Sequence, residues 1–301
     1  MPELGRVLTA MVTPFDDRGE LNLRAACDLA VALTECGSEG LVLAATTGEG
    51  PALSYDEKLQ LFRAVKEAVG DEVAVIAGTG SYNTRESIEL TREAGPHADA
   101  FLFIVPYYVR PTQEGLYQHF AALAAATSKP CILYNIPGRT AVNMTAETTI
   151  RLSHVSNIAG VKEASGDMSQ VAAIINGAAG GFRVWSGNDE DTFNIVSLGG
   201  YGVVGVITHL VGEQVAEMID LIRGGRIQKA ATLHNRLLPL RHAMFSVTSP
   251  TPIKWALRQL GVPVGPLRLP LVDPEPAQGE VILAELRRHE IDLKVAIPAR
   301  A

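Results

Sequence analysis

A lysine at the end of an apolar segment is the first side chain of this sequence that could do chemistry. Lys162 closes the apolar run of residues 158–162, and Glu163 follows it. Burial among apolar groups disfavours a protonated amine and lowers its pKa toward neutrality, and a neutral lysine can form a Schiff base with a ketone. The alternative is a structural lysine that caps a strand end and pairs with Glu163 or another carboxylate. Lys162 taken alone fits that alternative better, but the rest of the chain reverses the preference.

Other side chains of the sequence supply what a Schiff-base lysine would need. Thr46 and Thr47 could donate hydrogen bonds from hydroxyl and backbone groups to the carboxylate of a keto acid. Tyr134, at the end of the preceding apolar segment, could move protons through a second hydroxyl. Arg139 is the residue type that binds a carboxylate through two parallel hydrogen bonds. Together they indicate chemistry on a keto acid and a second, anionic substrate.

The elements that would position these residues follow from eight short apolar segments. The segments are residues 7–12, 40–45, 73–78, 100–105, 131–135, 158–162, 183–186 and 202–207. Their nearly continuous hydrophobicity predicts strands of a parallel sheet that are buried on both faces. The segments between them have helical periodicity, as in residues 23–36. Eight strand-and-helix units favour an α/β fold of the (β/α)₈ TIM barrel type over an open doubly wound sheet.

The sequence also predicts where several of these helices start. Ser54 and Glu57 form a capping box, and Thr84, Thr112 and Thr145 are predicted to cap the next three helices.

The pattern turns wholly helical from about residue 211. We therefore expect a catalytic barrel over residues 1–225 and a helical region packed on it over residues 226–301. An amphipathic helix is expected over residues 280–293.

Polar residues follow the expected strands at their carboxyl ends. In a parallel barrel these ends share one rim, which carries the active site. The residues concerned are Thr46, Thr47, Tyr107, Tyr108, Tyr134, Arg139, Lys162, Ser186, Asn188 and Asp189. Each could be a turn or a helix cap by itself, but their convergence on one rim indicates a site.

Composition and charge exclude several classes of protein. The 301 residues carry a formal charge of −7 without a dense Lys/Arg run, which argues against nucleic-acid binding. Three cysteines without a CxxC pair argue against a disulfide framework or a zinc site. No apolar stretch approaches the roughly 18 residues of a membrane span, and the first residues do not resemble a signal peptide. We expect a cytoplasmic protein. Residues 200–205 match G-x-G-x-x-G, but they lead into a strand and not out of one, unlike a dinucleotide site.

A family resemblance is carried by seven motifs spread over the chain. They are residues 9–15, 46–49, 106–108, 113–120, 134–140, 161–166 and 265–271. With these motifs the chain resembles the dihydrodipicolinate synthase branch of the pyruvate-dependent class I aldolase superfamily, from about residue 5 to 271. N-acetylneuraminate lyase belongs to the same superfamily.

The resemblance implies a role for each matching residue. Lys162 would form the Schiff base with pyruvate, and Tyr134, Thr46 and Tyr108 would relay protons, with Tyr108 reaching into a neighbouring subunit's site. The implied substrate-binding residues are Thr47 for the pyruvate carboxylate, Arg139 for aspartate semialdehyde, and Gly187 and Val204 for the wall of the pyruvate pocket.

The implied activity is condensation of pyruvate with L-aspartate 4-semialdehyde on the way to diaminopimelate and lysine. The resemblance implies neither a metal nor an organic cofactor, and it implies a homo-oligomer, of the tetramer-of-dimers type. Two alternatives stay open: a lyase or aldolase for N-acetylneuraminate or another 2-keto-3-deoxy acid, and a catalytically silent binding or regulatory homologue. The latter usually lacks the lysine or the tyrosine, and this chain has both.

Two positions depart from the family pattern. Ala45 stands where a glycine usually precedes the threonine pair, and its methyl group would narrow the pocket floor. Members inhibited by lysine usually carry Ser-Ala, His, His and Asn at an interface site, where this chain has Gly50-Pro51, Tyr55, Lys58 and Tyr82. Because a cation at Lys58 would repel the ammonium group of lysine, we expect weak or absent lysine inhibition.

Overall fold

Eight parallel strands close into a barrel in the computed structural model, which describes residues 3–294. The strands are β1 (Val7–Ala10), β2 (Gly40–Leu43), β3 (Ala74–Gly78), β4 (Ala100–Ile104), β5 (Cys131–Asn135), β6 (Ile158–Glu163), β7 (Arg183–Ser186) and β8 (Gly202–Gly205). Each pairs with the next, and β1 pairs with β8. The predicted TIM barrel is confirmed. Residues 1–2 and 295–301 of the two predicted regions lie outside the described residues.

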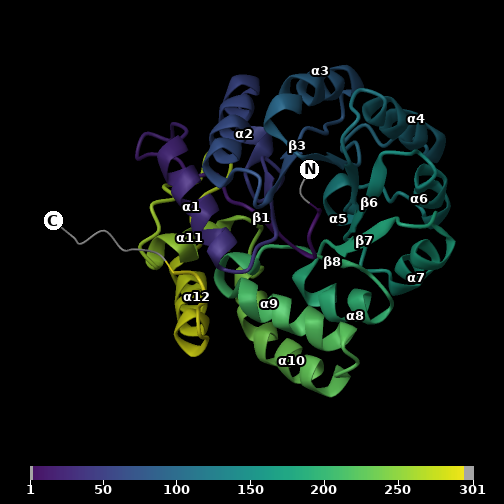
Figure 1. Cartoon of the computed structure of the whole chain (residues 1–301). Helices are drawn as coiled ribbons and strands as arrows, with labels where there is room; N and C mark the ends of the chain where they lie inside the picture. The colour runs from purple at the N-terminus through teal and green to yellow at the C-terminus, as the bar shows by residue number, and fades with distance from the viewer. Residues whose placement is uncertain (1–2, 295–301) are drawn as a thin grey trace.

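Helices ring the barrel, as Figure 1 shows. The α-helices are α1 (Leu23–Glu35), α2 (Tyr55–Val69), α3 (Thr84–Ala94), α4 (Gln113–Ala124), α5 (Pro137–Thr140), α6 (Ala146–Leu152), α7 (Met168–Gly177), α8 (Thr192–Ser197), α9 (Thr208–Arg223), α10 (Ile227–Met244), α11 (Thr251–Gln259) and α12 (Pro276–Arg288). Short 3₁₀ helices are η1 (Gly50–Ala52), η2 (Gly95–His97) and η3 (Asp189–Asp191). Among the helices of residues 3–294, none is both long and apolar enough to cross a membrane.

All eight predicted strands form, but four end earlier than their apolar segments; among them β4 stops at Ile104, one residue short. β1 stops before Val12 because the Val12 amide donates to His209 Nε2 over 3.1 Å. β2 stops at Leu43 because Ala44 has φ +53°, outside the extended region. β8 stops before Val206, whose amide donates to the carboxylate of Asp189. In β1, β2 and β8 a contact or turn thus replaces the sheet hydrogen bond.

The strand register decides which side chains enter the barrel. Tyr134, Lys162 and Trp185 are aligned across β5, β6 and β7. Successive side chains of a strand point to opposite faces, so these three point into the barrel. There Tyr134 and Trp185 join a buried cluster with other inward-facing apolar residues of the barrel strands, among them Leu8, Val42, Ile76, Leu102, Ile132 and Val204.

The predicted helix caps are confirmed with one exception. Ser54 and Glu57 form the capping box of α2, and Thr112 and Thr145 cap α4 and α6. The prediction for Thr84 is wrong, because the Asn83 side chain caps α3 instead. The Thr84 hydroxyl lies 2.8 Å from His119 Nδ1, so it forms a tertiary hydrogen bond instead of capping the helix.

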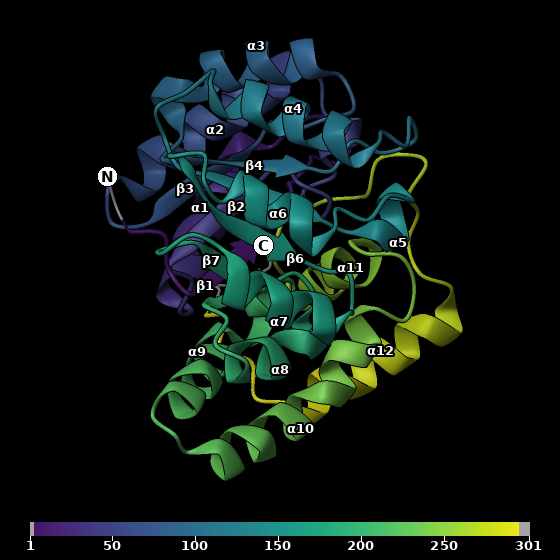
Figure 2. The same cartoon turned by 90° about the vertical axis from the view of Figure 1, so that its right-hand side faces the viewer.

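The C-terminal helices lie along one side of the barrel. α10 packs on α9 and α12, and α11 packs on α12 (Figure 2). The helix predicted over residues 280–293 is wrong in both limits, since α12 covers Pro276–Arg288. It starts at a capping box between Glu275 and Gln278, and the chain beyond it returns to α9, where the Asp292 amide donates to Leu210 O. The division of the chain at residue 225 stays a prediction.

Candidate active site

Lys162 lies inside the mouth of the barrel, near the carboxyl end of β6. Only 4% of the residue is exposed, and its Nζ lies 4.2 Å from the centroid of the Tyr134 ring. Burial lowers the pKa of Lys162 to about 8; the carboxylate of Asp189 opposes this change and the Arg139 guanidinium adds to it. A useful fraction of the amine is therefore neutral and nucleophilic near pH 7.

Glu163 does not serve as the counter-ion of Lys162. It follows Lys162 on β6 and faces the opposite side of the strand. Its carboxylate accepts hydrogen bonds from Asn135 Nδ2 (3.1 Å), the Ser165 amide (2.8 Å) and Gln170 Nε2 (3.3 Å). Within residues 3–294 no carboxylate lies within 4.0 Å of the Lys162 amine. The structural alternative of a Lys162–Glu163 pair is therefore wrong.

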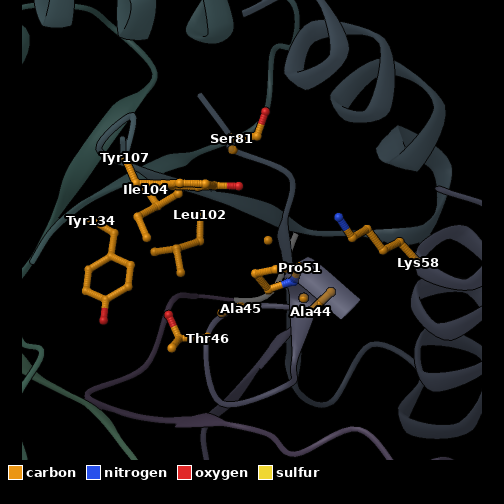
Figure 3. Close-up of a pocket in the computed structure, with 13 residues that line it drawn as sticks. Ala44, Ala45, Thr46, Pro51, Lys58, Ser81, Leu102, Ile104, Tyr107 and Tyr134 are labelled. Carbon is orange, nitrogen blue, oxygen red and sulfur yellow. The ribbon is translucent and has the colours of Figure 1, made fainter. Parts of the chain in front are cut away.

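Tyr134 and Thr46 place two hydroxyl groups at the same mouth. Figure 3 shows the hydroxyl of Tyr134 directed toward that of Thr46. Burial raises the pKa of Tyr134 to about 12, and the Arg139 charge and the Thr46 hydroxyl offset part of that rise. Tyr134 thus keeps its proton at neutral pH and can donate it to a reacting oxygen.

Thr47 is buried in the turn that follows β2. The turn passes close to the segment that follows β1, where the Thr13 hydroxyl donates to Gly48 O over 2.6 Å. A β-carbon on Gly48 would lie 3.0 Å from Met11 O, so the glycine is needed for this close approach. Thr47 is therefore held beside the segment that follows β1, at the carboxyl-end mouth of the barrel.

Gly187 and Val204 border the same interior. A β-carbon on Gly187 would lie 3.2 Å from Lys162 Cγ and 2.7 Å from the β-carbon of Ala164, so a larger residue would displace the lysine stem. Val204 is buried in β8 opposite Leu8 and belongs to the cluster that contains Tyr134. Gly187 therefore adjoins Lys162, and Val204 lies in the same buried cluster as Tyr134.

Arg139 approaches from α5, at the edge of the mouth. Its Nη2 donates to Ser249 O over 3.1 Å and its Nη1 to Thr248 Oγ1 over 3.5 Å, which joins α5 to the segment before α11 (Figure 2). Its charge acts on the pKa values of both Lys162 and Tyr134. Thr248 and Ser249 were not predicted, because their contact crosses more than 100 residues of sequence.

Tyr108 is the one predicted catalytic residue that this chain does not bring to Lys162. It is 89% exposed and has φ +70° in the loop after β4. Its neighbour Tyr107 turns the other way and packs edge to face on Tyr82, with ring centroids 5.2 Å apart. The role of Tyr108 in a neighbouring subunit stays a prediction.

Asp189, which the sequence analysis placed on the rim without assigning it a role, is a member of the site. It is buried just after β7, and its carboxylate accepts from the Val206 amide over 3.0 Å. Burial raises the pKa of Asp189 to about 6, against the Val206 hydrogen bond and the charges of Arg241 and Lys162. The available signal was a carboxylate directly after a strand on the catalytic rim. Asp189 supplies negative charge near the amine.

A cavity of about 70 Å³ extends from Tyr134 and Thr46 to Lys58 of α2. Figure 3 shows these two residues at one end and Lys58 at the other, with its amine directed toward the space between. Ala45 lines the cavity, as do Ser81 and Tyr107. The methyl group of Ala45 therefore takes up room in the space next to Thr46.

Known proteins resemble this chain over nearly its whole length. A family model described as the Dihydrodipicolinate synthetase family matches residues 3–286. A protein of Moorella thermoacetica named 4-hydroxy-tetrahydrodipicolinate synthase is 52% identical over 284 residues, which are 94% of this chain and 97% of that protein. The dihydrodipicolinate synthase structure from Bacillus anthracis has a TM-score of 0.93 at 40% identity, covering 95% and 99% of the two chains. That from Cyanidioschyzon merolae, with lysine bound, has a TM-score of 0.93 at 43% identity, covering 94% and 97%.

Proposed function

The chain belongs to the dihydrodipicolinate synthetase family, and from this premise we propose that it is a lyase that condenses pyruvate with L-aspartate 4-semialdehyde to 4-hydroxy-tetrahydrodipicolinate. The observation that carries the proposal is the buried Lys162 amine, 4.2 Å from the Tyr134 ring, at the mouth of the barrel. A neutral, desolvated amine beside a proton donor is what formation of a Schiff base requires. The identity to proteins named for this activity supports the choice of substrates.

The first half of the reaction activates pyruvate. Neutral Lys162 attacks the C2 carbonyl of pyruvate. The carbonyl oxygen takes one proton from Tyr134 and one from the attacking nitrogen, and it leaves as water when the protonated imine forms. Thr46 and Tyr108 of a neighbouring subunit return the proton to Tyr134, and Thr47 binds the pyruvate carboxylate. Loss of a C3 proton to the hydroxyl relay then gives the enamine: the C–H bonding pair forms the C2=C3 double bond, and the imine π pair moves to the nitrogen. The covalent pyruvate serves as the electron sink, so the proposed steps need no metal or organic cofactor.

The second half joins the two substrates. The enamine carbon attacks the aldehyde carbon of aspartate semialdehyde, whose carboxylate Arg139 binds through paired N–H groups. The new alkoxide takes a proton from the hydroxyl relay and becomes the 4-hydroxyl group. The amino group of the second substrate then attacks C2, closes the ring and displaces Lys162, which is free for the next turnover.

We also propose that the working form is a homo-oligomer in the cytoplasm, a tetramer built from dimers. The exposed side chain of Tyr108 supports an assembly, because a relay through it needs a second subunit to bring it near Lys162. Light scattering on the full chain tests the size of the assembly, and a monomer that is fully active would contradict the shared relay.

Measurement of product formation tests the proposed function against its relatives. Purified protein is incubated with pyruvate and aspartate semialdehyde, and in parallel with N-acetylneuraminate or 2-keto-3-deoxygluconate. We expect turnover of the first pair to exceed cleavage of the sugar acids by several orders of magnitude. Faster cleavage of a sugar acid would replace the proposal by the aldolase alternative, and no turnover of any of them would favour a silent homologue.

Arg139→Ala is expected to weaken use of the aldehyde selectively. Loss of a charge-assisted carboxylate contact costs about 1.5–3 kcal/mol, or roughly 10- to 150-fold in kcat/KM for aspartate semialdehyde. Borohydride trapping of pyruvate should change far less, since Arg139 lies at the edge of the mouth. Arg139→Lys serves as the matched control, because it keeps the charge and loses the paired donors. Equal losses for both substrates would contradict the assigned role.

Millimolar L-lysine is expected to leave the turnover rate above half of its uninhibited value. Lys58 directs a cation into the cavity beside Thr46 and Tyr134, and this charge repels the ammonium groups of lysine. The Cyanidioschyzon merolae enzyme, which has been crystallised with lysine, is the comparison protein. A rate halved by millimolar lysine in this chain would refute the expectation.

A further inference from the structure

The turn that carries both threonines of the site has an unusual backbone. We call residues 44–49 the threonine turn. Its first and last residues, Ala44 and Glu49, have φ angles of +53° and +52°. Residues with a side chain adopt this left-handed region rarely, and they keep it only where surrounding contacts determine the conformation. The threonine turn therefore depends on contacts that hold its two ends.

The contacts at Glu49 come from the C-terminal part of the chain. Glu49 Oε1 accepts a hydrogen bond from Lys254 Nζ of α11 over 2.6 Å, across 205 residues of sequence. Its Oε2 accepts from the Arg268 backbone amide over 2.8 Å. The side chains of Lys254 and Glu49 are 0% and 1% exposed. The last residue of the threonine turn is thus bound at both carboxylate oxygens inside the protein.

Both partners of Glu49 are themselves held in place. Lys254 Nζ lies 4.0 Å from the centroid of the Phe15 ring, and the Arg268 guanidinium lies 4.2 Å from it. Arg268 also donates to both carboxylate oxygens of Glu57 in α2. These cation–π and bidentate contacts are directional, so they give Glu49 a fixed point of attachment.

The connection from Glu49 to the reacting groups is short. The Glu49 amide donates to Thr46 O over 3.1 Å within the threonine turn, and Thr47 lies between them. A change at Glu49 therefore moves the peptide groups that place both hydroxyls. Displacements of about 1 Å at a substrate-positioning residue can cost about 100-fold in rate.

We propose that the Glu49–Lys254 ion pair is a positioning pair, which fixes the threonine turn so that Thr47 can bind the carboxylate of pyruvate. The inference rests on the proposed function and assigns a new role to α11, on the C-terminal side of the barrel strands. Neither residue of the pair touches the substrate; both act through the threonine turn.

A buried ion pair can also serve stability alone, so the test has to separate the two roles. Glu49→Gln and Lys254→Met each leave a buried group without its partner and are expected to lower stability as well as pyruvate binding. The double variant removes both charges and keeps similar side-chain volumes. Replacement of a whole buried pair is often neutral for stability, so this variant isolates the positioning effect.

The measurement is the pyruvate concentration that gives half-maximal borohydride trapping, together with the melting temperature. We expect the double variant to melt near the wild-type temperature and to need about 10- to 100-fold more pyruvate, with an unchanged KM for aspartate semialdehyde. Asp273→Asn is the matched control, because it breaks the 2.5 Å Arg258–Asp273 contact in the same part of the chain. It should leave the half-maximal concentration unchanged.

The possible results separate the positioning role of the Glu49–Lys254 pair from the proposed function. A folded double variant that traps pyruvate at wild-type concentrations overturns the positioning role. If the double variant does not fold, Glu49→Asp replaces it: the shorter side chain keeps the charge but pulls the turn, and an unchanged half-maximal concentration again overturns the inference. Wild-type protein that traps no pyruvate would instead defeat the proposed function.

Discussion

Replacement of Lys162 by alanine is expected to abolish covalent trapping of pyruvate and to lower kcat/KM for the condensation by at least about 10⁴-fold. The amine is the only group of the proposed mechanism that forms a bond to the substrate, and water cannot take its place as an electron sink. Borohydride reduction followed by mass spectrometry checks the adduct and its position. The wild-type protein should carry a single reduced pyruvate on Lys162.

Lys58→Ala provides the matched control for this experiment. Lys58 is also partly buried, which lowers the pKa of its amine against the charge of Glu86, and it faces the cavity that reaches Tyr134. The Lys58→Ala variant should keep the adduct on Lys162, since Lys58 lies at the far end of that cavity. An adduct that persists in Lys162→Ala, or one that disappears in Lys58→Ala, would contradict the assignment of the nucleophile.

The pH dependence of trapping provides a second check on Lys162. Only the neutral amine attacks, and burial lowers the pKa of Lys162 from the ordinary 10.5 to about 8. At pH 7 about one tenth of the amine is then neutral, against fewer than about one in a thousand for an ordinary lysine. The trapping rate at low pyruvate should therefore rise about tenfold per pH unit below pH 8 and level off above it. A rise that continues to pH 10 would show an unperturbed lysine.

The barrel and the order of its strands could be predicted because their signal is local. Each strand is a short, nearly continuous apolar segment, and eight such segments alternate with amphipathic helices. The ends of the strands were less predictable, since they depend on distant partners. The β1 end is set by His209 and the β8 end by Asp189. Neither partner can be assigned before the fold is known.

In the site, too, local signals could be predicted and contacts with distant partners could not. Lys162 and Tyr134 end neighbouring strands, so the barrel topology alone brings them together. Glu163 was considered as the partner of Lys162 from adjacency in sequence, but alternation along β6 places it on the other face. The attachment of Glu49 to Lys254 crosses 205 residues, and no local pattern indicates it. Chemistry at strand ends was therefore predictable, and the contacts that support it were not.

Tyr134→Phe is expected to lower kcat by about 10²- to 10⁴-fold, the usual range for loss of a general acid or base. The substitution keeps the ring that packs beside the Lys162 amine and removes only the hydroxyl that faces Thr46. Because burial raises the pKa of Tyr134 to about 12, the hydroxyl is a proton donor at neutral pH. Its loss should slow every step that moves a proton, including formation of the imine.

The expected pattern separates a proton relay from a packing role. In Tyr134→Phe, borohydride trapping should slow with kcat, while the half-maximal pyruvate concentration at equilibrium and the melting temperature should stay close to the wild-type values. Tyr201→Phe is the matched control: it removes a tyrosine hydroxyl that lies 3.2 Å from Glu3 Oε1 at the amino end of the barrel strands, and it should keep kcat within about twofold of the wild-type value. A wild-type kcat in Tyr134→Phe would contradict the relay, because it would show that the reaction does not need the Tyr134 hydroxyl as a proton donor.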